Sequence, residues 1–504
     1  MSFARVSERF RSVLVLAALA GMANVFAFAP FGLFFIPVLS LALLFRLVDG
    51  AEPWRAAWTG FVFGAAWFAA GNYWIFISLH VFGKAPIILA VLVMLLMFAI
   101  MGAYYALFGW LSARFSPRND TFRHLAWLPA LWVALEWIRG WFLSGYPWFS
   151  LGYSQTETAL AGLAPVAGVF GVSLVVAMLA GCLALLSRGV VRPASAFAIT
   201  LAALLTISAF ALDRVSWTRP TGERLSVALV QGNVAQDEKW LTTQRVPTML
   251  KYWSLTEEHA DADLIVWPEA AIPALYYQLD TGFYAQLEDE LLRGEGRLLT
   301  GTLVHDLAED VYYNSAVVLG ADERRFYHKR HLVPFGEYFP VPDFVRNWLR
   351  LMNLPYSDFE TGRDGSALEI APGLAAAIMI CYEAVFGEEV ITALPEAHLL
   401  VNISNDGWFG RSIGPLQHFQ IARMRAIETG RWLIRGTNTG VTAIVDHHGR
   451  VRASVPQFET TVLRGEVELR EGATPYVRFG NWPVVIAAFF LLATGFASRK
   501  WSAR

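Results

Sequence analysis

The stretch SVLVLAALAGMANVFAFAPFGLFFIPVLSLALLF, residues 12–45, contains no charged side chain. Its 34 residues would form a helix of about 51 Å, too long for one crossing of a bilayer core of about 30 Å. Pro30 and Gly32 lie near the middle of the stretch and predict a break in the helix. We therefore expect two membrane-spanning helices here.

The rest of the sequence has the composition of a membrane protein. Hydrophobic residues make up 55% of the 504 residues and charged residues only 16%, against about 25% charged residues in soluble proteins. Further apolar stretches follow at 56–79, 85–113, 124–142, 158–187, 193–212 and 480–498. Together with the first stretch they predict eight spans.

Two features qualify this assignment. Arg5, Arg9 and Arg11 precede the first apolar run, as they would in a signal peptide, but further spans follow at once, so we expect an uncleaved first helix. The fifth span contains Glu136 and Arg139, three residues apart, which predicts an ion pair at the end of a helix.

Charges divide the chain near residue 213. Of the 40 Lys and Arg and the 42 Asp and Glu residues, only 12 and 6 lie before it. In the terminal segments and the short loops between eight spans, 13 Lys or Arg residues fall on one side and 2 on the other. Because basic loops stay in the cytoplasm, residues 1–212 and 480–504 are expected to form the membrane part, with both termini inside the cell. The segment 213–479 would face the periplasm of a bacterium.

The segment 213–479 has the pattern of an α/β domain. Strand-like runs alternate with helix-like runs, an order typical of sheets covered by helices. The predicted strands are 225–234, 264–273, 297–304, 312–320, 374–383, 399–406 and 441–446. The predicted helices are 243–259, 281–293, 387–394 and 415–430.

The chain has two cysteines, which are expected to differ in role. Cys182 lies in an apolar span, where a cysteine is usually a small buried hydrophobe. Cys381 ends the apolar run LAAAIMI, so its thiol would be held at a strand end, where a nucleophile is rigid and exposed. An inert core cysteine remains the alternative for Cys381. The only other cysteine is expected inside the bilayer, so a disulfide is not expected.

Two more ionisable residues follow predicted strands. Glu269 lies in WPEAAIP directly after a strand, and Lys329 lies in YHKRHLVPFGEY. Thiolate chemistry needs a base for the thiol proton and a cation for the oxyanion, which Glu269 and Lys329 would supply. A Cys–His dyad using one of the histidines after residue 327 is the alternative. No histidine pair has HExxH spacing, so no metal or other cofactor is expected.

The motifs WPEAAIP (267–273), YHKRHLVPFGEY (327–338) and ICYE (380–383), in this order, resemble the Glu, Lys and Cys motifs of the carbon-nitrogen hydrolase, or nitrilase, superfamily. With seven helices before this domain and one after it, the chain resembles the apolipoprotein N-acyltransferase family. SNDGWFG (404–410), followed by GPLQHFQIARMRAIE, strengthens the resemblance.

The resemblance implies an αββα sandwich with Glu269 as general base, Lys329 as oxyanion stabiliser and Cys381 as nucleophile. Four supporting residues are implied as well: Trp240, Glu337, Tyr382 and Glu383. From the residues alone, one of Tyr382 and Glu383 would contact substrate, and the other would hold the ammonium of Lys329. The whole is a polytopic α-helical membrane domain joined to an α/β extramembrane domain.

The resemblance also implies the reaction and its partners. An acyl chain would pass from a phospholipid, through a thioester, to the α-amino group of the N-terminal diacylglyceryl-cysteine of an apolipoprotein, in a bacterial inner membrane. We expect a monomer. A net charge of −2 gives no basic excess for nucleic acid. The alternatives are a membrane-tethered amidase or nitrilase acting on a small carbon-nitrogen substrate, and a transporter with a regulatory outer domain.

Overall fold

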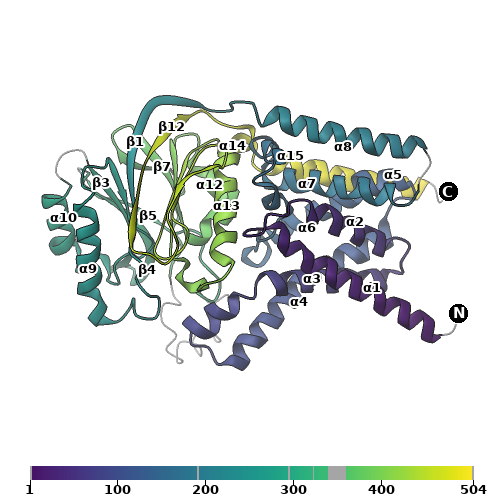
Figure 1. Ribbon diagram of the computed structural model, residues 1–504, viewed down its shortest axis with the longest axis horizontal. Coiled ribbons are helices and arrows are strands. Elements are labelled where there is room, and N and C mark those ends of the chain that lie inside the picture. Colours follow the sequence, from purple (N-terminus) through teal and green to yellow (C-terminus); the bar gives the residue numbers. More distant parts are fainter. Residues whose placement is uncertain (1–2, 190–191, 293–295, 322, 339–358, 502–504) are drawn as a thin grey trace. The chain divides into compact units, whose positions relative to one another are not determined.

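A computed structural model describes residues 3–189, 192–292, 296–321, 323–338 and 359–501 (Figure 1). The described chain divides into two compact units. A helical unit comprises Met1–Val215, Phe409–Gln420 and Arg478–Arg504. A second unit, which holds the strands, comprises Ser216–Trp408 and Ile421–Val477.

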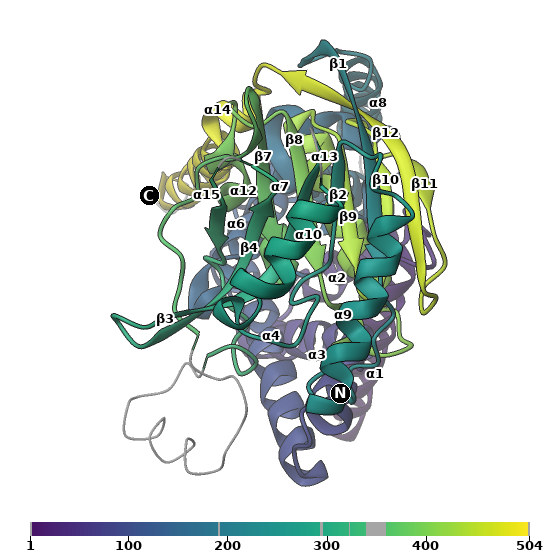
Figure 2. The same cartoon turned by 90° about the vertical axis from the view of Figure 1, so that its left-hand side faces the viewer.

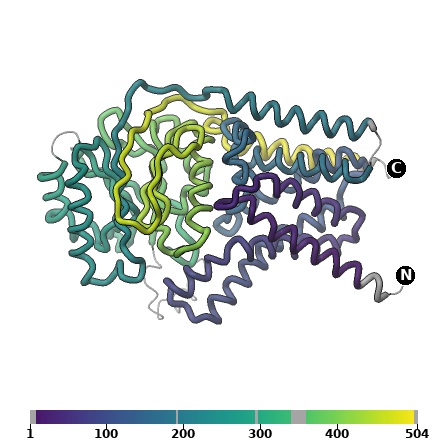
Figure 3. The backbone as a smooth tube through the Cα atoms, viewed as in Figure 1, coloured from purple at the N-terminus to yellow at the C-terminus, as the bar shows by residue number. Residues whose placement is uncertain are grey.

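Each of the seven apolar stretches contains a helix, and the first contains two, as the backbone trace in Figure 3 makes visible. The predicted break at Pro30 and Gly32 falls between the first two helices. The helices of this unit are α1 (Phe3–Ala23), α2 (Ile36–Val48), α3 (Pro53–Gly71), α4 (Ile87–Phe115), α5 (Asp120–Phe122), α6 (Leu128–Arg139), α7 (Ala164–Leu186), α8 (Arg192–Leu212) and α15 (Trp482–Trp501).

Four helical segments are long and apolar enough to cross a membrane, among the residues that the structure describes. They are Glu8–Ala27, Ile87–Phe115, Ala159–Leu186 and Pro193–Leu212. Two shorter apolar helices lie at Ile36–Val48 and Trp482–Ser498. The structure thus supports a helical region with four candidate spans, and the count of eight spans stays a prediction.

Small residues bring the helices of this unit close together. A Cβ added to Gly60 of α3 would lie 1.9 Å from the carbonyl oxygen of Tyr105 on α4. A Cβ added to Gly109 of α4 would lie 2.0 Å from the carbonyl oxygen of Ala56 on α3. Because the two backbones touch, only glycine fits at either position, as is common where apolar helices associate in lipid.

The two charged residues of the fifth predicted span lie at the end of α6 and are both buried. Their ion pair is long, with Arg139 Nη2 4.0 Å from Glu136 Oε1. Each side chain also holds the following segment. Arg139 donates to the carbonyl of Trp148 at 2.6 Å, and Glu136 accepts from the backbone of Leu151 at 2.8 Å. The pair therefore fixes the chain between α6 and α7.

The segment Phe409–Gln420 belongs with the helices although it lies far from them in the sequence. It contains the start of α13 (Gly414–Thr429). Gln417 Oε1 accepts hydrogen bonds from the indoles of Trp74, at 3.2 Å, and Trp148, at 2.9 Å. These two buried contacts explain why the segment groups with the helical unit. From the sequence it was expected, as part of 213–479, in the α/β domain.

Among the described residues, the strands of the second unit form two six-stranded sheets. The strand order is β12-β1-β2-β3-β4-β5 in one sheet and β11-β10-β9-β8-β7-β6 in the other. In both sheets the three central strands run parallel and the outer strands pair antiparallel. The strands are β1 (Arg219–Gln231), β2 (Leu264–Val266), β3 (Arg297–Asp306), β4 (Val311–Leu319), β5 (Arg325–His328), β6 (Leu368–Ala371), β7 (Leu374–Ile380), β8 (Leu399–Ser404), β9 (Leu433–Thr437), β10 (Ala443–Val445), β11 (Val451–Ser454) and β12 (Thr461–Glu471).

The sheets pack face to face and helices cover their outer faces. One core joins the inner faces, with Val227 and Val266 from the first sheet and Ile378 and Val401 from the second. A second core lies between the first sheet and the helices α9 (Thr242–Glu257) and α10 (Ala285–Glu290), which stand in front of the strands in Figure 2. The short α12 (Gly387–Val390) and the part of α13 from Ile421 lie on the other side (Figure 1). The layers are therefore helix, sheet, sheet, helix.

Each predicted element of this unit contains the expected kind of structure, but five strands of the described residues were not predicted. All seven predicted runs contain a strand, although the run 264–273 is a strand only over Leu264–Val266. The missed strands are β5, β6, β9, β11 and β12. β12, TVLRGEVELRE, mixes charged and apolar residues because it lies at the edge of its sheet and exposes one face.

Candidate active site

The three residues predicted to carry the chemistry all follow strands of the second unit. Glu269 comes three residues after β2, Lys329 directly after β5 and Cys381 directly after β7. Two of these turns have positive φ angles, +53° at Cys381 and +44° at Ala270. L-residues adopt this conformation rarely, at a cost of about 1–3 kcal/mol, and it recurs at functional sites.

A buried ammonium and two carboxylates form the centre of the site. Lys329 is only 1% exposed, and its Nζ lies 2.7 Å from Glu337 Oε1 and 3.6 Å from Glu269 Oε1. The amide of Asn314 donates to the same two oxygens, at 2.7 Å for Glu269 and 2.9 Å for Glu337. The structure thus brings together Glu269, Lys329 and Glu337, which lie up to 68 residues apart in the sequence.

The carboxylates determine the charge state of Lys329. Burial alone would lower the pKa of this ammonium, but the carboxylates of Glu337 and Glu269 raise it further than burial lowers it. The pKa of Lys329 therefore lies above its ordinary value, and the group stays positively charged at neutral pH.

Glu269 is held at both oxygens. Oε1 faces Lys329 and Asn314, and Oε2 accepts a hydrogen bond from the backbone N–H of Asn405 at 2.9 Å. The side chain is 8% exposed. Donors on both sides fix the direction of this carboxylate, as is required of a group that takes a proton from a defined atom.

Cys381 is partly buried. Burial raises the pKa of its thiol, the negative charge of Glu269 raises it further, and the positive charge of Lys329 acts in the opposite direction. The thiol is therefore protonated at neutral pH and needs a base before it can act as a nucleophile. Glu269 and Lys329 are the two charged groups that act most strongly on the sulfur.

Glu383 bonds to the main chain beside Lys329 and Cys381. Among the described residues, the carboxylates at ion-pair distance from Lys329 are those of Glu269 and Glu337. Glu383 instead accepts from the backbone N–H of Arg330 and of Ile380, both at 2.7 Å. Those residues adjoin Lys329 and Cys381, so Glu383 ties the two loops together rather than holding the ammonium.

The other two supporting residues lie in the same unit. Tyr382 is buried, and its ring centre lies 5.8 Å from that of His331 and 5.1 Å from that of Phe386. Trp240 is partly buried in the segment after β1, with its ring centre 6.0 Å from Nζ of the preceding residue, Lys239.

Several residues that the sequence did not single out contribute to the site. The ammonium of Lys239 is 1% exposed and lies 3.3 Å from the main-chain oxygen of Glu269. Burial lowers the pKa of Lys239 to about 8. Asn314 lies within β4 and carried no signal. Asn405 follows strand β8, and the rule that singled out Cys381, a polar residue at a strand end, also applies to it.

A second buried ion pair lies beside the site. Arg435 of β9 and Asp406 are both fully buried, with Nη2 2.8 Å from Oδ2. Ser404 donates to the other oxygen of Asp406 at 2.8 Å. Asp406 also acts to raise the pKa of the Cys381 thiol. This pair fixes the segment that presents the backbone N–H of Asn405 to Glu269.

Two family models match the two parts of the chain. Residues 20–182 match the model of the apolipoprotein N-acyltransferase N-terminal domain, and residues 226–474 match that of the carbon-nitrogen hydrolase family. The solved structure of Saccharomyces cerevisiae Nit3, a member of branch 10 of the nitrilase superfamily, is similar to 49% of this chain and 90% of its own, at 19% identity and a TM-score of 0.36.

Two curated relatives are similar to nearly the whole chain. The apolipoprotein N-acyltransferase of Methylococcus capsulatus is 42% identical over 491 residues, 97% of each chain. That of Nitrosomonas europaea is 43% identical over 492 residues, 96% of each chain. Identity at this level over both the helical and the strand-containing parts shows that the chain belongs to the apolipoprotein N-acyltransferase family.

Proposed function

We propose that this enzyme moves an acyl chain from a phospholipid to the α-amino group of the N-terminal diacylglyceryl-cysteine of an apolipoprotein, with a thioester on Cys381 as the intermediate. The observation that carries the proposal is the buried ion pair of Lys329 and Glu269, 3.6 Å long, whose charges act on the Cys381 thiol. A base and a cation are thereby available to one sulfur.

In the first half-reaction the thiol proton passes to Glu269 as sulfur attacks the ester carbonyl of the phospholipid. The carbonyl oxygen becomes an oxyanion, which the ammonium of Lys329 stabilises. When the C–O bond breaks, the proton held by Glu269 goes to the leaving oxygen. A lysophospholipid departs and the acyl group remains on Cys381 as a thioester.

In the second half-reaction the acceptor amine attacks the thioester. An α-amino group has a pKa near 8, so a usable fraction is neutral at pH 7. Glu269 takes the amine proton as the C–N bond forms, and the sulfur leaves as a thiol once it receives that proton. The amide product departs and the free thiol is restored, which makes the kinetics ping-pong.

We further propose how the chain lies in the membrane. Residues 1–212 and 480–504 form eight spans, and residues 213–479 face the periplasm of a bacterium from its inner membrane. Both substrates carry long acyl chains, and moving each buried CH₂ into water would cost about 0.8 kcal/mol. A site at the bilayer surface avoids that cost. The enzyme acts as a monomer and needs no cofactor, since every step uses side chains.

Labelled phospholipid tests the proposal. The full-length protein, a Cys381→Ala variant and a Cys182→Ala variant are each incubated with phospholipid that carries labelled acyl chains, and the label on the intact protein is measured by mass spectrometry. Wild type and Cys182→Ala should gain one acyl group that neutral hydroxylamine removes, and Cys381→Ala should gain none. Equal labelling of the two variants would exclude Cys381 as the nucleophile.

A chase distinguishes acyl transfer from hydrolysis. The labelled enzyme is mixed with a diacylated lipopeptide with a free N-terminus, or with the same peptide N-acetylated. The free amine should remove the label and become a triacylated peptide, and the acetylated peptide should not. Release of free fatty acid alone, at the same rate with either peptide, would favour the membrane-tethered hydrolase instead.

A further inference from the structure

One amide lies between the two carboxylates of the candidate active site. Asn314 of β4 is 4% exposed, and its Nδ2 donates to Glu269 Oε1 at 2.7 Å and to Glu337 Oε1 at 2.9 Å. An Asn side chain has two N–H hydrogens, so each carboxylate receives one of them. Asn314 is therefore a neutral bridge between the proposed base and the loop that carries Glu337.

The backbone fixes the position of this amide. β4 lies between β3 and β5 in its sheet and is bonded to both, with Leu303 of β3 opposite Asn314. The main-chain oxygen of Asn314 also accepts from the backbone N–H of Lys329 at 2.8 Å. The side chain that contacts both carboxylates therefore starts from an interior strand that also holds the loop of Lys329.

A single ammonium is at ion-pair distance from both carboxylates among the described residues. It belongs to Lys329, and it lies 2.7 Å from Glu337 but 3.6 Å from Glu269, so it compensates the two charges unequally. Two carboxylates that lie this close repel each other and readily share one proton. If Glu269 held such a proton, it could not take the proton of the Cys381 thiol.

The orientation of the Asn314 amide suits two ionised carboxylates. With Nδ2 toward them, the buried Oδ1 has no hydrogen-bond partner among the described residues, which costs stability. The reversed amide would place Oδ1 against two carboxylate oxygens, which is favourable only if one of them carries a proton. The amide thus keeps its donors on the carboxylates and leaves its own acceptor unsatisfied.

We propose that Asn314 is a positioning residue for the acylation of Cys381: its amide keeps Glu269 and Glu337 from sharing a proton, so that the Glu269 carboxylate is free to take the thiol proton. The proposal rests on the proposed function, in which Glu269 is the base. A second cation in place of the amide would oppose the protonation of Glu269. An amide supplies donors without adding that charge.

Single-turnover acylation of Cys381 by labelled phospholipid, measured in the full-length protein as a function of pH, tests this role. Asn314→Asp puts a third carboxylate where the amide was, and Asn314→Ala removes the two donors. Both should slow acylation about 10- to 100-fold at pH 7. Both should recover as the pH rises, because the shared proton is then lost. The acid limb of the pH–rate profile should therefore move to higher pH, which a purely structural loss would not cause.

A double variant tests whether the number of carboxylates is the cause. Asn314→Asp combined with Glu337→Gln restores one amide and two carboxylates, so its acid limb should return toward that of the wild type. Other charged or titratable groups that act on Glu269 are unchanged in every variant. They include Lys329, Lys239 and Cys381.

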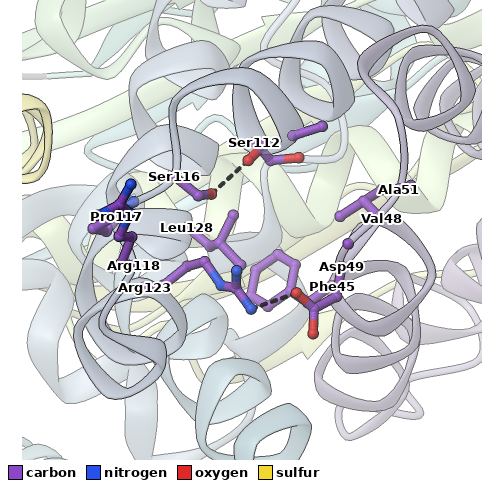
Figure 4. Close-up of a pocket in the computed structure, with 12 residues that line it drawn as sticks. Phe45, Val48, Asp49, Ala51, Ser112, Ser116, Pro117, Arg118, Arg123 and Leu128 are labelled. Atoms are coloured by element: carbon purple, nitrogen blue, oxygen red, sulfur yellow. Dashed lines mark hydrogen bonds and ion pairs between the residues drawn. The ribbon is translucent and has the colours of Figure 1, made fainter. Parts of the chain in front are cut away.

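Two controls separate this effect from a loss of stability. Asn233→Asp makes the same change where the amide donates to the main-chain oxygen of Phe458, at 2.9 Å. Asp49→Asn removes the ion pair with Arg123 beside a cavity of about 220 Å³ in the helical unit (Figure 4). Either change should lower the thermal midpoint of unfolding, and neither should move the acid limb.

An acid limb of Asn314→Ala that coincides with that of the wild type would overturn the proposal, whether or not Asn314→Asp folds. So would an equal shift in either control, or a double variant that keeps the acid limb of Asn314→Asp. In each of these cases, acylation of Cys381 in the wild type would leave the proposed function intact. A wild-type protein that gains no acyl group on Cys381 would overturn both.

Discussion

The ammonium of Lys329 lies closer to Glu337 than to any other carboxylate at ion-pair distance among the described residues, at 2.7 Å between Nζ and Oε1. Glu337 also accepts from the backbone N–H of Val333 at 2.7 Å, which anchors its second oxygen to its own loop. The charge that holds Lys329 in place therefore comes from a loop, whereas Glu269, the proposed base, follows a strand.

Replacing Glu337 with Gln tests whether Glu337 holds the Lys329 ammonium in place. The change removes a charge-assisted hydrogen bond worth about 1.5–3 kcal/mol, so thioester formation should slow about 10- to 100-fold. The pKa of Lys329 should also fall, because the Glu337 carboxylate, whose negative charge raises this pKa most, is gone. The alkaline limb of the pH–rate profile should then move to lower pH, which single-turnover acylation measures.

Glu369→Gln is the control for Glu337→Gln. Glu369 also pairs with a basic residue, Arg325, at 2.5 Å, but both side chains are well exposed. Exposed pairs contribute little, so this variant should acylate at the wild-type rate. A wild-type pH profile for Glu337→Gln would contradict the role given to Glu337.

The buried charge of Lys239 should lower the free energy of unfolding, and the side chain should also support acylation of Cys381. Burial lowers the pKa of Lys239 to about 8 in the folded protein, against about 10.4 unfolded. The unfolded chain therefore binds this proton more tightly, and keeping the charge in the fold costs about 3 kcal/mol at pH 7. Lys239→Met should raise the thermal midpoint and slow acylation, since the carbonyl of Glu269 loses its donor.

The pH dependence separates the two effects at Lys239. Wild-type stability should rise with pH between about 8 and 10.4, where only the unfolded chain still carries this proton, and Lys239→Met should lack that rise. Lys251→Met is the matched control, since the Lys251 ammonium also donates to a main-chain oxygen, that of Gly232 at 3.1 Å. Equal effects of the two substitutions on acylation would contradict a special role for Lys239.

A histidine away from the site should make the protein sensitive to acid. Burial, with added repulsion from Arg470, lowers the pKa of His447 to about 4, against about 6.5 in the unfolded chain. Between those values only the unfolded chain takes up the proton, so stability should fall as pH drops from 6.5 to 4. The loss is about 1–3 kcal/mol, reduced because the ring is partly exposed.

His447→Gln should weaken this dependence on pH. Unfolding in denaturant is followed at pH 7 and at pH 5 for the wild type, for His447→Gln and for the neighbouring variant His448→Gln. The difference in free energy of unfolding between the two pH values should shrink in the first variant and persist in the second. Identical differences in all three proteins would assign the acid sensitivity to other groups.

The helices and the residues at strand ends could be predicted from the sequence, because both leave a pattern of apolar residues. Charge-free stretches indicated the helices, and apolar runs ending in Glu269 and Cys381 indicated residues that lie at strand ends. Lys239 and Asn314 escaped because their function comes from the fold. In the sequence, Lys239 is one charge in a polar segment and Asn314 is one amide within a strand. Only the folded chain brings their side chains to Glu269.

The partners of Glu383 and the grouping of the segment Phe409–Gln420 were not predicted, for a related reason. Either Tyr382 or Glu383 was expected to hold the Lys329 ammonium, and the sequence did not reveal that Glu383 would accept from backbone N–H groups on two loops. The segment Phe409–Gln420 groups with the helices through Gln417 and two tryptophans that lie more than 260 residues earlier. Contacts at that separation leave no periodic signal.

Gly301 should control the position of Glu269 without touching its side chain. A Cβ added to Gly301 in β3 would lie 2.6 Å from the Cα of Glu269 and 2.6 Å from the backbone nitrogen of Ala270. Backbone atoms cannot rotate away, so Gly301→Ala should push the strained turn at Ala270 outward. A displacement of about 1 Å at a reacting group costs about 100-fold in rate.

The size of the loss at Gly301 is measured as single-turnover acylation of Cys381. Gly282→Ala is the matched control, because a Cβ there meets no atom within 4 Å. Gly301→Ala should acylate about 100-fold more slowly while it still unfolds cooperatively, and Gly282→Ala should match wild type. Since Gly301→Ala leaves Glu269, Lys329 and Cys381 in the chain, a wild-type rate would mean that the direction of the Glu269 carboxylate does not limit thiol deprotonation.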